Sequence, residues 1–272
     1  MNIDAMRRKA NEIRKDVITS CVTSGAGHIA PSLSCVDILV ALYYSEMHRS
    51  EDPKWEKRDR LVFSKAHGCY GLYSILVDIG YLERQEWIDF YHGSSLSGCV
   101  ERNLDCGIEA SCGSLGHGLP LAVGIAFGAR LQGASYRTYC IVGDGEMQEG
   151  SNWEAIQFAV KHKLSNLTIV VDANGLQAMD FLCDVLSLED SSAELNAKFS
   201  AFGCEVSVCD GHDHGMVVSA LRGFTESMGT GKPLVIIART IKGYGLTCME
   251  NVAKFHFRVP TPTDLLEGNR YE

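Results

Sequence analysis

The sequence predicts an α/β fold in which a mostly parallel sheet carries helices on both faces. Three short apolar runs rich in β-branched residues, over 139–142, 167–171 and 234–238, are typical of buried parallel strands. A helical pattern over 152–164 lies between the first two runs, so strand, turn, helix and strand follow one another. Such a unit closes through a right-handed crossover, as parallel sheets require.

The N-terminal part supplies the other expected elements. Residues 4–24 repeat apolar positions at helical spacing and end at a Ser-Gly-Ala-Gly break, which predicts an N-terminal helix. A second helix is expected to begin near Ser34. Residues 59–64 are predicted to form a short strand, followed by an apolar helix through Leu76. The carboxyl end of that strand would therefore deliver His67.

Composition narrows the class of protein. The 272 residues are 46% hydrophobic and carry a net charge of −9, which describes a folded, soluble, acidic chain with enough apolar residues for a full core. We expect one α/β domain over 1–258 and a loosely organised C-terminal tail over 259–272. Apart from the short Arg7-Arg8-Lys9 the sequence has no Lys/Arg run, and nucleic-acid binding starts from a basic surface. We therefore expect no nucleic-acid partner.

The cysteines and the hydropathy pattern indicate where the protein works. The eleven cysteines are scattered and never spaced as Cys-x-x-Cys, which argues against a disulfide framework or a zinc ribbon. The N-terminus has no signal-type apolar stretch, and no apolar window of about 18 residues occurs in the chain. We therefore expect a reducing, cytoplasmic location and no membrane partner.

Polar residues gather where two of the predicted strands end. Gly143-Asp144-Gly145 follows the first strand, and Asn174 follows the second. Both turns emerge at the carboxyl edge of a parallel sheet, where open α/β folds bind ligands, so we expect Asp144 and Asn174 to lie side by side. Carboxylate, amide and carbonyl oxygens are hard ligands suited to Mg²⁺ or Ca²⁺. The flanking glycines let the backbone approach a diphosphate, which a helix N-terminus favours.

An ordinary turn is the competing interpretation of this motif, because Gly and Asp dominate turns in all proteins. Three features together favour the cation site. Twenty-eight residues separate Gly145 from Asn174, both positions follow predicted strands, and Glu149 stands five residues after Asp144.

This motif resembles the thiamine diphosphate signature of the transketolase family, in which Gly-Asp-Gly is followed at this distance by Asn. The resemblance extends over most of the chain and implies a thiamine diphosphate-binding fold. It includes four further motifs. These are Ser24 to Ser32 with Gly27-His28, Arg58 to Gly68 with His67, Gly113 to Gly118, and Lys242 to Gly245 with Met249-Glu250-Asn251 and His256.

The resemblance implies how the cofactor is held. Asp144, Asn174 and the backbone carbonyl of Leu176 would bind Mg²⁺ or Ca²⁺, and the assignment of Leu176 rests on backbone position only. Gly145 and His67 would reach the diphosphate.

The opposite end of the cofactor is assigned to the glycine-rich loop. By resemblance, Gly113 and Leu115 would contact the pyrimidine end. Taken alone, the Gly-x-x-Gly-x-Gly spacing of this loop is equally typical of close helix packing.

Three histidines match residues that line the family's substrate channel, which implies catalytic roles for His28, His67 and His256. His256 would also contact the cofactor. Neutral imidazoles can donate and accept protons there. A histidine taken singly is more often an ordinary core or surface residue. The coincidence of three with motif positions favours the catalytic interpretation.

Glu149 resembles an acid that joins a hydrogen-bonded carboxylate network across the subunit interface, where raised pKa values are expected. The alternative is a glutamate favoured by the dipole at a helix N-terminus. His212 and His214 are suggestive of a metal pair. Their surroundings resemble a family loop, and no other ligand is near in sequence, so we expect no metal there.

Only the diphosphate-binding half of the family's cofactor site is found in this sequence. The glutamate that activates the aminopyrimidine belongs to the family's pyrimidine-binding domain, and the sequence contains no substitute for it. The resemblance is therefore to the N-terminal subunit of a split transketolase. It implies a partner chain with the pyrimidine and C-terminal domains, two copies of each subunit, and transfer of a two-carbon ketol unit from a ketose phosphate to an aldose.

Two departures from the family pattern concern substrate choice. Family members carry His-Pro before the cofactor loop, whereas this chain has Cys99-Val100 and no histidine between His92 and His117. The identity of the donor is therefore open, since a missing hydrogen-bond donor changes what a site accepts. Ala178-Met179-Asp180 also replaces the usual Ile-Asp-Gly.

Three alternatives to this function remain at this stage. One is a related thiamine diphosphate enzyme with a specialised sugar or carrier-bound acceptor. Another is a non-catalytic scaffold chain, against which the retained Asp144, Glu149 and Asn174 argue. The third is a nicotinamide dehydrogenase, which would need Gly-x-Gly-x-x-Gly after the first strand and an acid about 20 residues on. The sequence has neither in that context.

Overall fold

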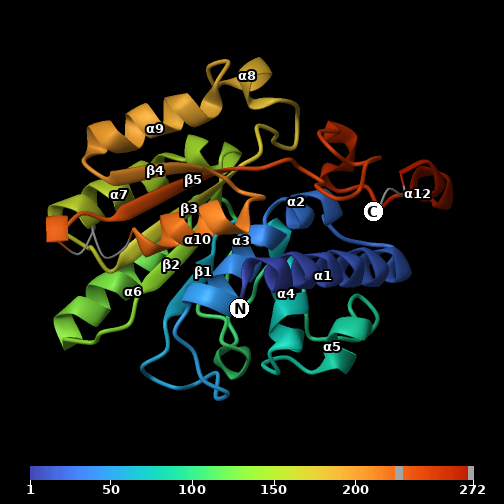
Figure 1. Cartoon of the computed structure of the whole chain (residues 1–272), viewed down its shortest axis with the longest axis horizontal. Coiled ribbons are helices and arrows are strands. Elements are labelled where there is room, and N and C mark those ends of the chain that lie inside the picture. Colours follow the sequence, from blue (N-terminus) through green and yellow to red (C-terminus); the bar gives the residue numbers. More distant parts are fainter. Residues whose placement is uncertain (224–228, 269–272) are drawn as a thin grey trace.

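Five strands form one parallel sheet in the order β1-β2-β3-β5-β4 (Figure 1). The structure is a computed structural model that describes residues 1–223 and 229–268. The predicted α/β fold class is confirmed. The strands are β1 (Arg60–Phe63), β2 (Thr138–Gly143), β3 (Leu167–Ala173), β4 (Glu205–Asp210) and β5 (Leu234–Arg239).

Four of these strands follow the predicted runs, and β4 was not predicted. The apolar runs form the central strands β2, β3 and β5, whose side chains are almost all buried. Burial on both faces explains why they read as continuous apolar segments. Strand β4 lies at the edge of the sheet, and most of its side chains are partly exposed, so its sequence carries a weaker apolar signal.

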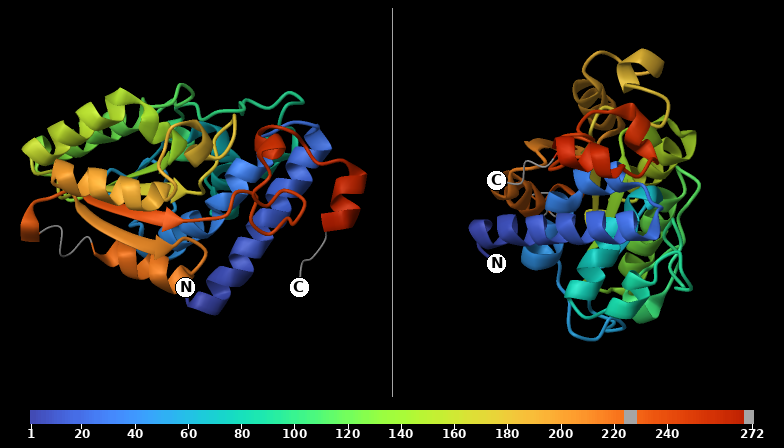
Figure 2. Two further views of the ribbon diagram at one scale, coloured as in Figure 1. Left: turned by 90° about the horizontal axis from the view of Figure 1, so that it is seen from above. Right: turned by 90° about the vertical axis from the view of Figure 1, so that its right-hand side faces the viewer.

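Helices cover both faces of the sheet (Figure 2). Helices α6, α7 and α9 form one layer, and α3 and α10 lie on the opposite side. The helices are α1 (Ile3–Ser24), α2 (Ile29–Ser34), α3 (Val36–Ala41), α4 (Cys69–Asp78), α5 (Arg84–Ile88), α6 (Gly118–Gln132), α7 (Gly150–Lys161), α8 (Leu182–Val185), α9 (Ser191–Phe202), α10 (His214–Arg222) and α12 (Pro262–Gly268).

The ends of the N-terminal helix follow from its sequence. The side chain of Asn2 accepts a hydrogen bond from the N–H of Ala5, and Gly25 ends α1 in the left-handed conformation. The helix predicted near Ser34 begins at Val36 as α3. A further helix of only six residues, α2, precedes it and was not predicted; it tolerates Pro31 because proline is accepted in the first turn of a helix.

The register of the sheet places two loops next to each other. Gly143 at the end of β2 pairs with Asp172 in β3, so the turns that follow both strands leave the sheet at the same edge. Short helical turns follow β1 at Ala66–Gly68 and β2 at Gly145–Gln148. The motif residues therefore sit at the carboxyl edge, which is where parallel sheets collect ligand-binding loops.

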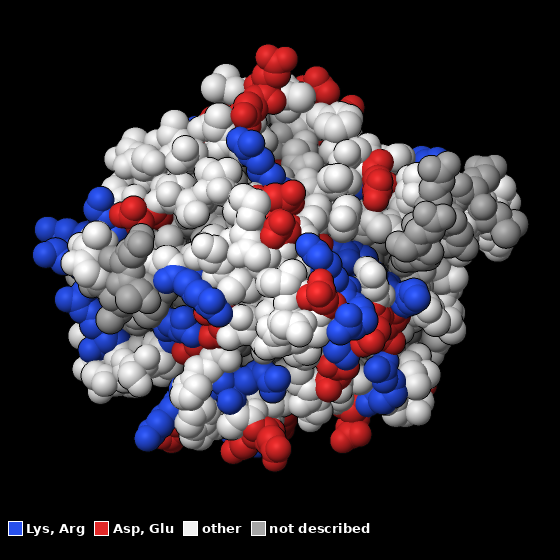
Figure 3. Space-filling model, in the orientation of Figure 1, with Lys and Arg blue, Asp and Glu red and all other residues white. Residues whose placement is uncertain are grey.

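The C-terminal part and the surface complete the description. Helix α12 lies within the predicted tail, residues 269–272 lie outside the described residues, and the division at 258/259 stays a prediction. None of the described helices is both long and apolar enough to cross a membrane. Over the described part of the face in Figure 3, Lys and Arg lie among Asp and Glu.

Candidate functional site

A cavity of about 320 Å³ opens at the carboxyl edge of the sheet. Residues that follow β1, β2, β3 and β5 line it together with the glycine-rich loop. Nine of the ten residues singled out in the sequence are in its wall: His28, His67, Gly113, Leu115, Asp144, Gly145, Asn174, Leu176 and His256. Segments more than 200 residues apart in the chain therefore meet in one place.

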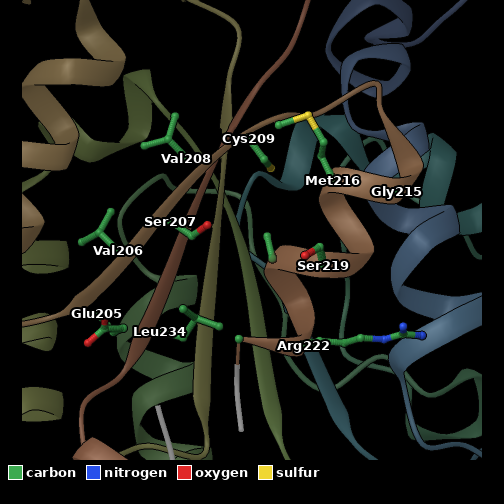
Figure 4. A pocket seen from close by; sticks show the side chains of 12 residues that line it. Glu205, Val206, Ser207, Val208, Cys209, Gly215, Met216, Ser219, Arg222 and Leu234 are labelled. Atoms are coloured by element: carbon green, nitrogen blue, oxygen red, sulfur yellow. The ribbon is translucent and has the colours of Figure 1, made fainter. Parts of the chain in front are cut away.

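A larger groove of about 730 Å³ lies elsewhere, between the edge strand β4 and helix α10 (Figure 4). Its wall includes Val206, Val208 and Met216, and it contains none of the residues that the sequence singled out. Size alone does not identify the site; the small cavity combines concave shape with convergent polar groups.

The two predicted loop tips lie side by side, as expected. The carboxylate of Asp144 accepts hydrogen bonds from the N–H groups of Gly175, at 2.6 Å, and Gly145, at 2.8 Å. The side-chain oxygen of Asn174 accepts from the N–H of Leu176 at 3.1 Å. Asp144 and Asn174 thus face the same cavity from neighbouring strands.

The electrostatics of Asp144 favour a bound cation. Burial raises the pKa of its carboxyl to about 6, although the N–H groups of Gly175 and Gly145 act in the opposite direction. A divalent ion would remove the cost of holding this charge away from water. The oxygens of Asp144, Asn174 and Leu176 are the donor type that Mg²⁺ or Ca²⁺ prefers, so this set fits such an ion. The metal role of the three residues stays a prediction.

Lys242, which the sequence analysis placed in a family motif without giving it a role, links two parts of the site. The amino group of Lys242 donates to the carbonyl oxygens of Leu176, at 3.1 Å, and Gln177, at 3.3 Å, and to Nδ1 of His256 at 2.8 Å. Burial lowers the pKa of Lys242 to about 7, and the positive charge of Lys65 also acts to lower it. Lys242 therefore holds the loop after Asn174 against the histidines.

A buried ion pair, whose role the sequence did not reveal, joins Lys65 in the cavity wall to Asp172 in β3. The ammonium of Lys65 donates to the carboxylate of Asp172, to the carbonyl oxygen of Pro31 at 2.7 Å and to the hydroxyl of Ser34 at 2.9 Å. The hydroxyl of Thr240 donates to the same carboxylate. Burial alone would favour the neutral forms, but the pairing raises the pKa of Lys65 and lowers that of Asp172. The position of Asp172 near the end of the apolar strand β3 was the sequence signal that could have revealed this pair.

The three predicted histidines form a triangle at one side of the cavity. The distances between ring centroids are 5.4 Å from His28 to His67, 5.5 Å from His28 to His256 and 5.0 Å from His67 to His256. Burial, followed by nearby positive groups, lowers their pKa values to about 4, 2 and 3 respectively. All three rings are therefore neutral near pH 7, as proton donors and acceptors require.

Glu146 ties the glycine-rich loop to the sheet, a contact that the sequence did not reveal. Its carboxylate accepts hydrogen bonds from the Ser64 hydroxyl, from the N–H of Gly116 at 3.0 Å and from the N–H of Gly143 at 3.2 Å. Burial raises its pKa, and the three donors partly compensate. Gly116 has φ +81°, and a Cβ there would lie 2.6 Å from Cβ of Glu149, so the loop requires glycine.

The tenth predicted residue, Glu149, is exposed and is not in the cavity wall. It stands at the N-cap of α7 without a side-chain cap hydrogen bond. Its role in a carboxylate network across a subunit interface stays a prediction.

Cys99 and Ala178, where the sequence departs from the family pattern, are both part of the cavity wall. Burial raises the pKa of the Cys99 thiol, which keeps it neutral.

His212 and His214 lie outside the cavity wall. Nδ1 of His212 lies 2.7 Å from the carboxylate of Asp37, and Nε2 of His214 lies 3.4 Å from the other oxygen of that carboxylate. The two histidines therefore face a buried acid instead of forming a separate pair.

The comparisons with known proteins all indicate the same family. The family model described as the transketolase thiamine diphosphate binding domain matches residues 5–259. An apulose-4-phosphate transketolase subunit from Actinobacillus succinogenes is 38% identical over 266 residues, which cover 96% of this chain and 93% of that protein. The 6-deoxy-6-sulfo-D-fructose transketolase subunit SqwG of a Clostridium species is 35% identical over 254 residues, covering 92% of this chain and 90% of that protein.

Solved structures agree. The crystal structure of transketolase from Campylobacter jejuni superimposes with a TM-score of 0.84 at 31% identity and covers 95% of this chain. The match covers 41% of the Campylobacter chain, so the present chain spans about two fifths of that protein's length. The fold, the motif spacing and these similarities agree: the chain belongs to the transketolase family and corresponds to its thiamine diphosphate-binding part.

Proposed function

We propose that this chain is the diphosphate-binding subunit of a two-chain transketolase that transfers a two-carbon ketol unit from a ketose phosphate to an aldose. The observation that carries the proposal is the single cavity that brings Asp144, Asn174 and the three neutral histidines together. Nearly full-length similarity to proteins named as transketolase subunits supports the two-chain form.

The cofactor assignment extends the family match to individual residues. Asp144, Asn174 and the carbonyl of Leu176 would hold Mg²⁺ or Ca²⁺, and the N–H of Gly145 and the ring of His67 would face the diphosphate. Gly113 and Leu115 would contact the pyrimidine end. When bound, thiamine diphosphate supplies the electron sink for breaking and forming the carbon–carbon bond.

The residues of this chain bind, orient and move protons. The cavity encloses the reacting groups, and His28, His67 and His256 hold protons that can pass to or from substrate hydroxyl and carbonyl oxygens. Their neutral state at pH 7 suits both directions of transfer. Protonated Lys242 can only donate, so in that form it makes Nδ1 of His256 an acceptor and leaves the proton of this ring on Nε2.

The partner would supply the pyrimidine-binding domain and its glutamate. We propose two copies of each subunit with two-fold symmetry, since closed symmetric assemblies are the commonest form of soluble oligomers, and a cytoplasmic location. Glu149, exposed at the start of α7, is available to such a partner.

A second candidate function uses a different ketose as the donor substrate. Cys99 presents a neutral thiol to the cavity where the family carries a histidine, and a thiol is a weak hydrogen-bond donor. The two relatives are named for different ketoses, an apulose phosphate and a sulfofructose. A specialised phosphorylated or sulfonated ketose is therefore the alternative donor class.

Calorimetry with thiamine diphosphate and Mg²⁺ tests the cofactor site. In the presence of the partner subunit, wild type should bind and Asp144→Ala should lose at least about a hundredfold in affinity, because a metal ligand is removed. Asp105→Ala, an exposed control, should bind like wild type. Equal affinity of Asp144→Ala and wild type would remove the metal assignment.

Two further measurements test the two-chain form. Native mass spectrometry of the co-expressed pair should show a complex with equal numbers of both subunits, and isolated monomers would contradict it. Two-carbon transfer should require both chains. Clear turnover by the purified chain alone would show that no partner is needed.

A further inference from the structure

A buried ion cluster lies outside the cofactor cavity and joins three distant segments. Arg14 from α1 forms an ion pair with Asp37 from α3, and both side chains are only 3% exposed. Nδ1 of His212, in the turn before α10, lies 2.7 Å from the same carboxylate. Together, Arg14, Asp37 and His212 form what we call the Asp37 cluster.

His212 also contacts the segment that follows β5. Its Nε2 accepts a hydrogen bond from the N–H of Ile241 at 2.8 Å. Because Nε2 accepts, the ring proton is on Nδ1 and points to Asp37, which determines the tautomer. The ring also stacks on Tyr244 with 3.6 Å between centroids and 18° between planes. Arg14 lies over the same Tyr244 ring, 4.8 Å from its centroid.

The segment held in this way, 240–245, carries Lys242, which lines the cofactor cavity. Lys242, next to Ile241, donates to the carbonyl oxygens of Leu176 and Gln177 and to His256. At the other side of Ile241, the hydroxyl of Thr240 donates to the carboxylate of Asp172. A displacement of the Ile241 backbone would therefore disturb Lys242 in the cavity wall and, through Thr240, the carboxylate that pairs with the wall residue Lys65.

Contacts of Gly243 also hold this segment, so its backbone has little room to shift if the contact with His212 is lost. The N–H of Gly243 donates to the carbonyl oxygen of Ala30 at 3.0 Å, two residues after His28. Gly243 has φ +82°, and a Cβ there would lie 2.6 Å from the carbonyl oxygen of Met249. The segment is packed closely enough that His212 and Gly243 define its position from two sides.

We propose that His212, oriented by Asp37, is a positioning residue of this transketolase subunit, which holds Ile241 so that Lys242 keeps the Leu176 carbonyl and His256 in place for the cofactor. The inference rests on the proposed function and adds a residue that the family match does not assign. It also gives a role to the histidine motif that the cofactor site left unexplained.

Two substitutions at His212 separate its contacts. His212→Asn places an amide near the position of Nδ1, where it can donate to Asp37, but it is too short to accept from Ile241. His212→Gln is long enough to accept from Ile241. For the assembled complex, calorimetry with thiamine diphosphate and Mg²⁺ should give an affinity roughly 10–100-fold weaker for His212→Asn, because a partner of the ligand-bearing loop is lost. His212→Gln should recover most of that loss.

Asp213→Ala is the matched control in the same turn. It removes the side-chain cap that Asp213 provides to the N–H of Met216 in α10, without touching Ile241. Thermal unfolding should show this variant less stable than wild type, yet with cofactor affinity within about twofold. If His212 had only a structural role, the loss of cofactor affinity would parallel the loss of thermal stability in all variants.

The outcomes separate the two proposals. Wild-type affinity in His212→Asn, or equal loss in Asp213→Ala and His212→Asn, would overturn the positioning role while leaving the cofactor site intact. Failure of the wild-type complex to bind thiamine diphosphate would overturn the proposed function, and the inference with it. Loss in His212→Asn with recovery in His212→Gln supports the proposal.

Discussion

The cofactor cavity and the Asp37 cluster lie on two sides of the segment 240–245 and differ in how buried charge is compensated. In the Asp37 cluster, the carboxylate forms an ion pair with Arg14 and contacts Nδ1 of His212, so the guanidinium compensates its negative charge directly. In the cavity, the pKa of Asp144 is raised to about 6 and that of Lys242 lowered to about 7, which are shifts toward the neutral forms.

This contrast separates the part of the molecule that holds the fold together from the part prepared for a ligand. A compensated buried pair costs little in the folded state, but loss of one member is expensive. Buried groups whose pKa values are displaced by burial mark functional sites, because a bound ion or ligand completes their surroundings. Among the described residues that line the cavity, Lys65 resembles the Asp37 cluster, because the carboxylate of Asp172 compensates its charge.

The largest expected effect is on stability and tests this contrast directly. Asp37→Asn should lower the free energy of unfolding by about 3–5 kcal/mol, because Arg14 would remain buried without a counter-charge. Asp144→Asn should lower it by only about 1–2 kcal/mol, because its amide –NH₂ would face one backbone N–H donor, while removal of a charge that burial disfavours offsets part of that loss. Urea unfolding measures both. Similar losses in the two variants would break the comparison.

The second effect is stabilisation by ligand. Thiamine diphosphate with Mg²⁺, at about a hundred times the dissociation constant, should raise the free energy of unfolding of the wild-type complex by about 2.7 kcal/mol. Asp144→Asn should show almost none of this increase, and addition of a chelator should remove it from wild type. Thermal scans with and without ligand provide the measurement. A wild-type shift that survives chelation would argue against the metal.

A smaller effect is expected at Glu146, a cavity carboxylate whose oxygens are occupied by three donors. Glu146→Gln should cost about 1–3 kcal/mol of stability, because the amide –NH₂ would face a hydroxyl or N–H donor. Urea unfolding again gives the value. If Glu146→Gln is as stable as wild type, the glycine-rich loop is not held through this side chain.

The fourth prediction concerns pH. The cavity histidines and the Asp37 cluster should change the stability of the fold in different pH ranges. The pKa values of His28, His67 and His256 are lowered in the folded chain, so below pH about 6.5 the unfolded state binds protons that the folded state does not. Stability should therefore fall as pH decreases from about 6.5 toward about 4. Urea unfolding as a function of pH should show a shallower slope in His28→Gln.

Asp37 should affect the stability of the fold at lower pH than the histidines do. Burial alone would raise its pKa, but the charge of Arg14 and the contact with His212 lower it overall. A carboxyl with a lowered folded pKa stabilises the fold above its unfolded pKa of about 3.9, and this stability is lost as pH falls through the folded value. Asp37→Asn should therefore flatten the stability curve below pH about 4. A change confined to the range from about pH 5 to 7 would contradict the assignment.

Much of the site could be predicted because its residues mark the ends of strands. Asp144 and Asn174 follow continuous apolar runs, and the parallel arrangement of such runs brings the following turns to one edge. The residues whose roles were missed, Glu146, Asp172 and Lys242, act through contacts with distant segments. Strand β4 was missed for a related reason, since an edge strand is only half buried and its apolar pattern is weak.

Local sequence signals were sufficient for the fold class, the central strands, the N-terminal helix and the place of the Gly-Asp-Gly motif, because apolar periodicity and turn residues act over a few neighbouring positions. The contacts of Lys242 with His256 and Leu176, and the connection that His212 makes between Asp37 and Ile241, became visible only in the folded chain. These pairings depend on how whole elements pack, and no local spacing encodes the distance between side chains that are remote in the chain.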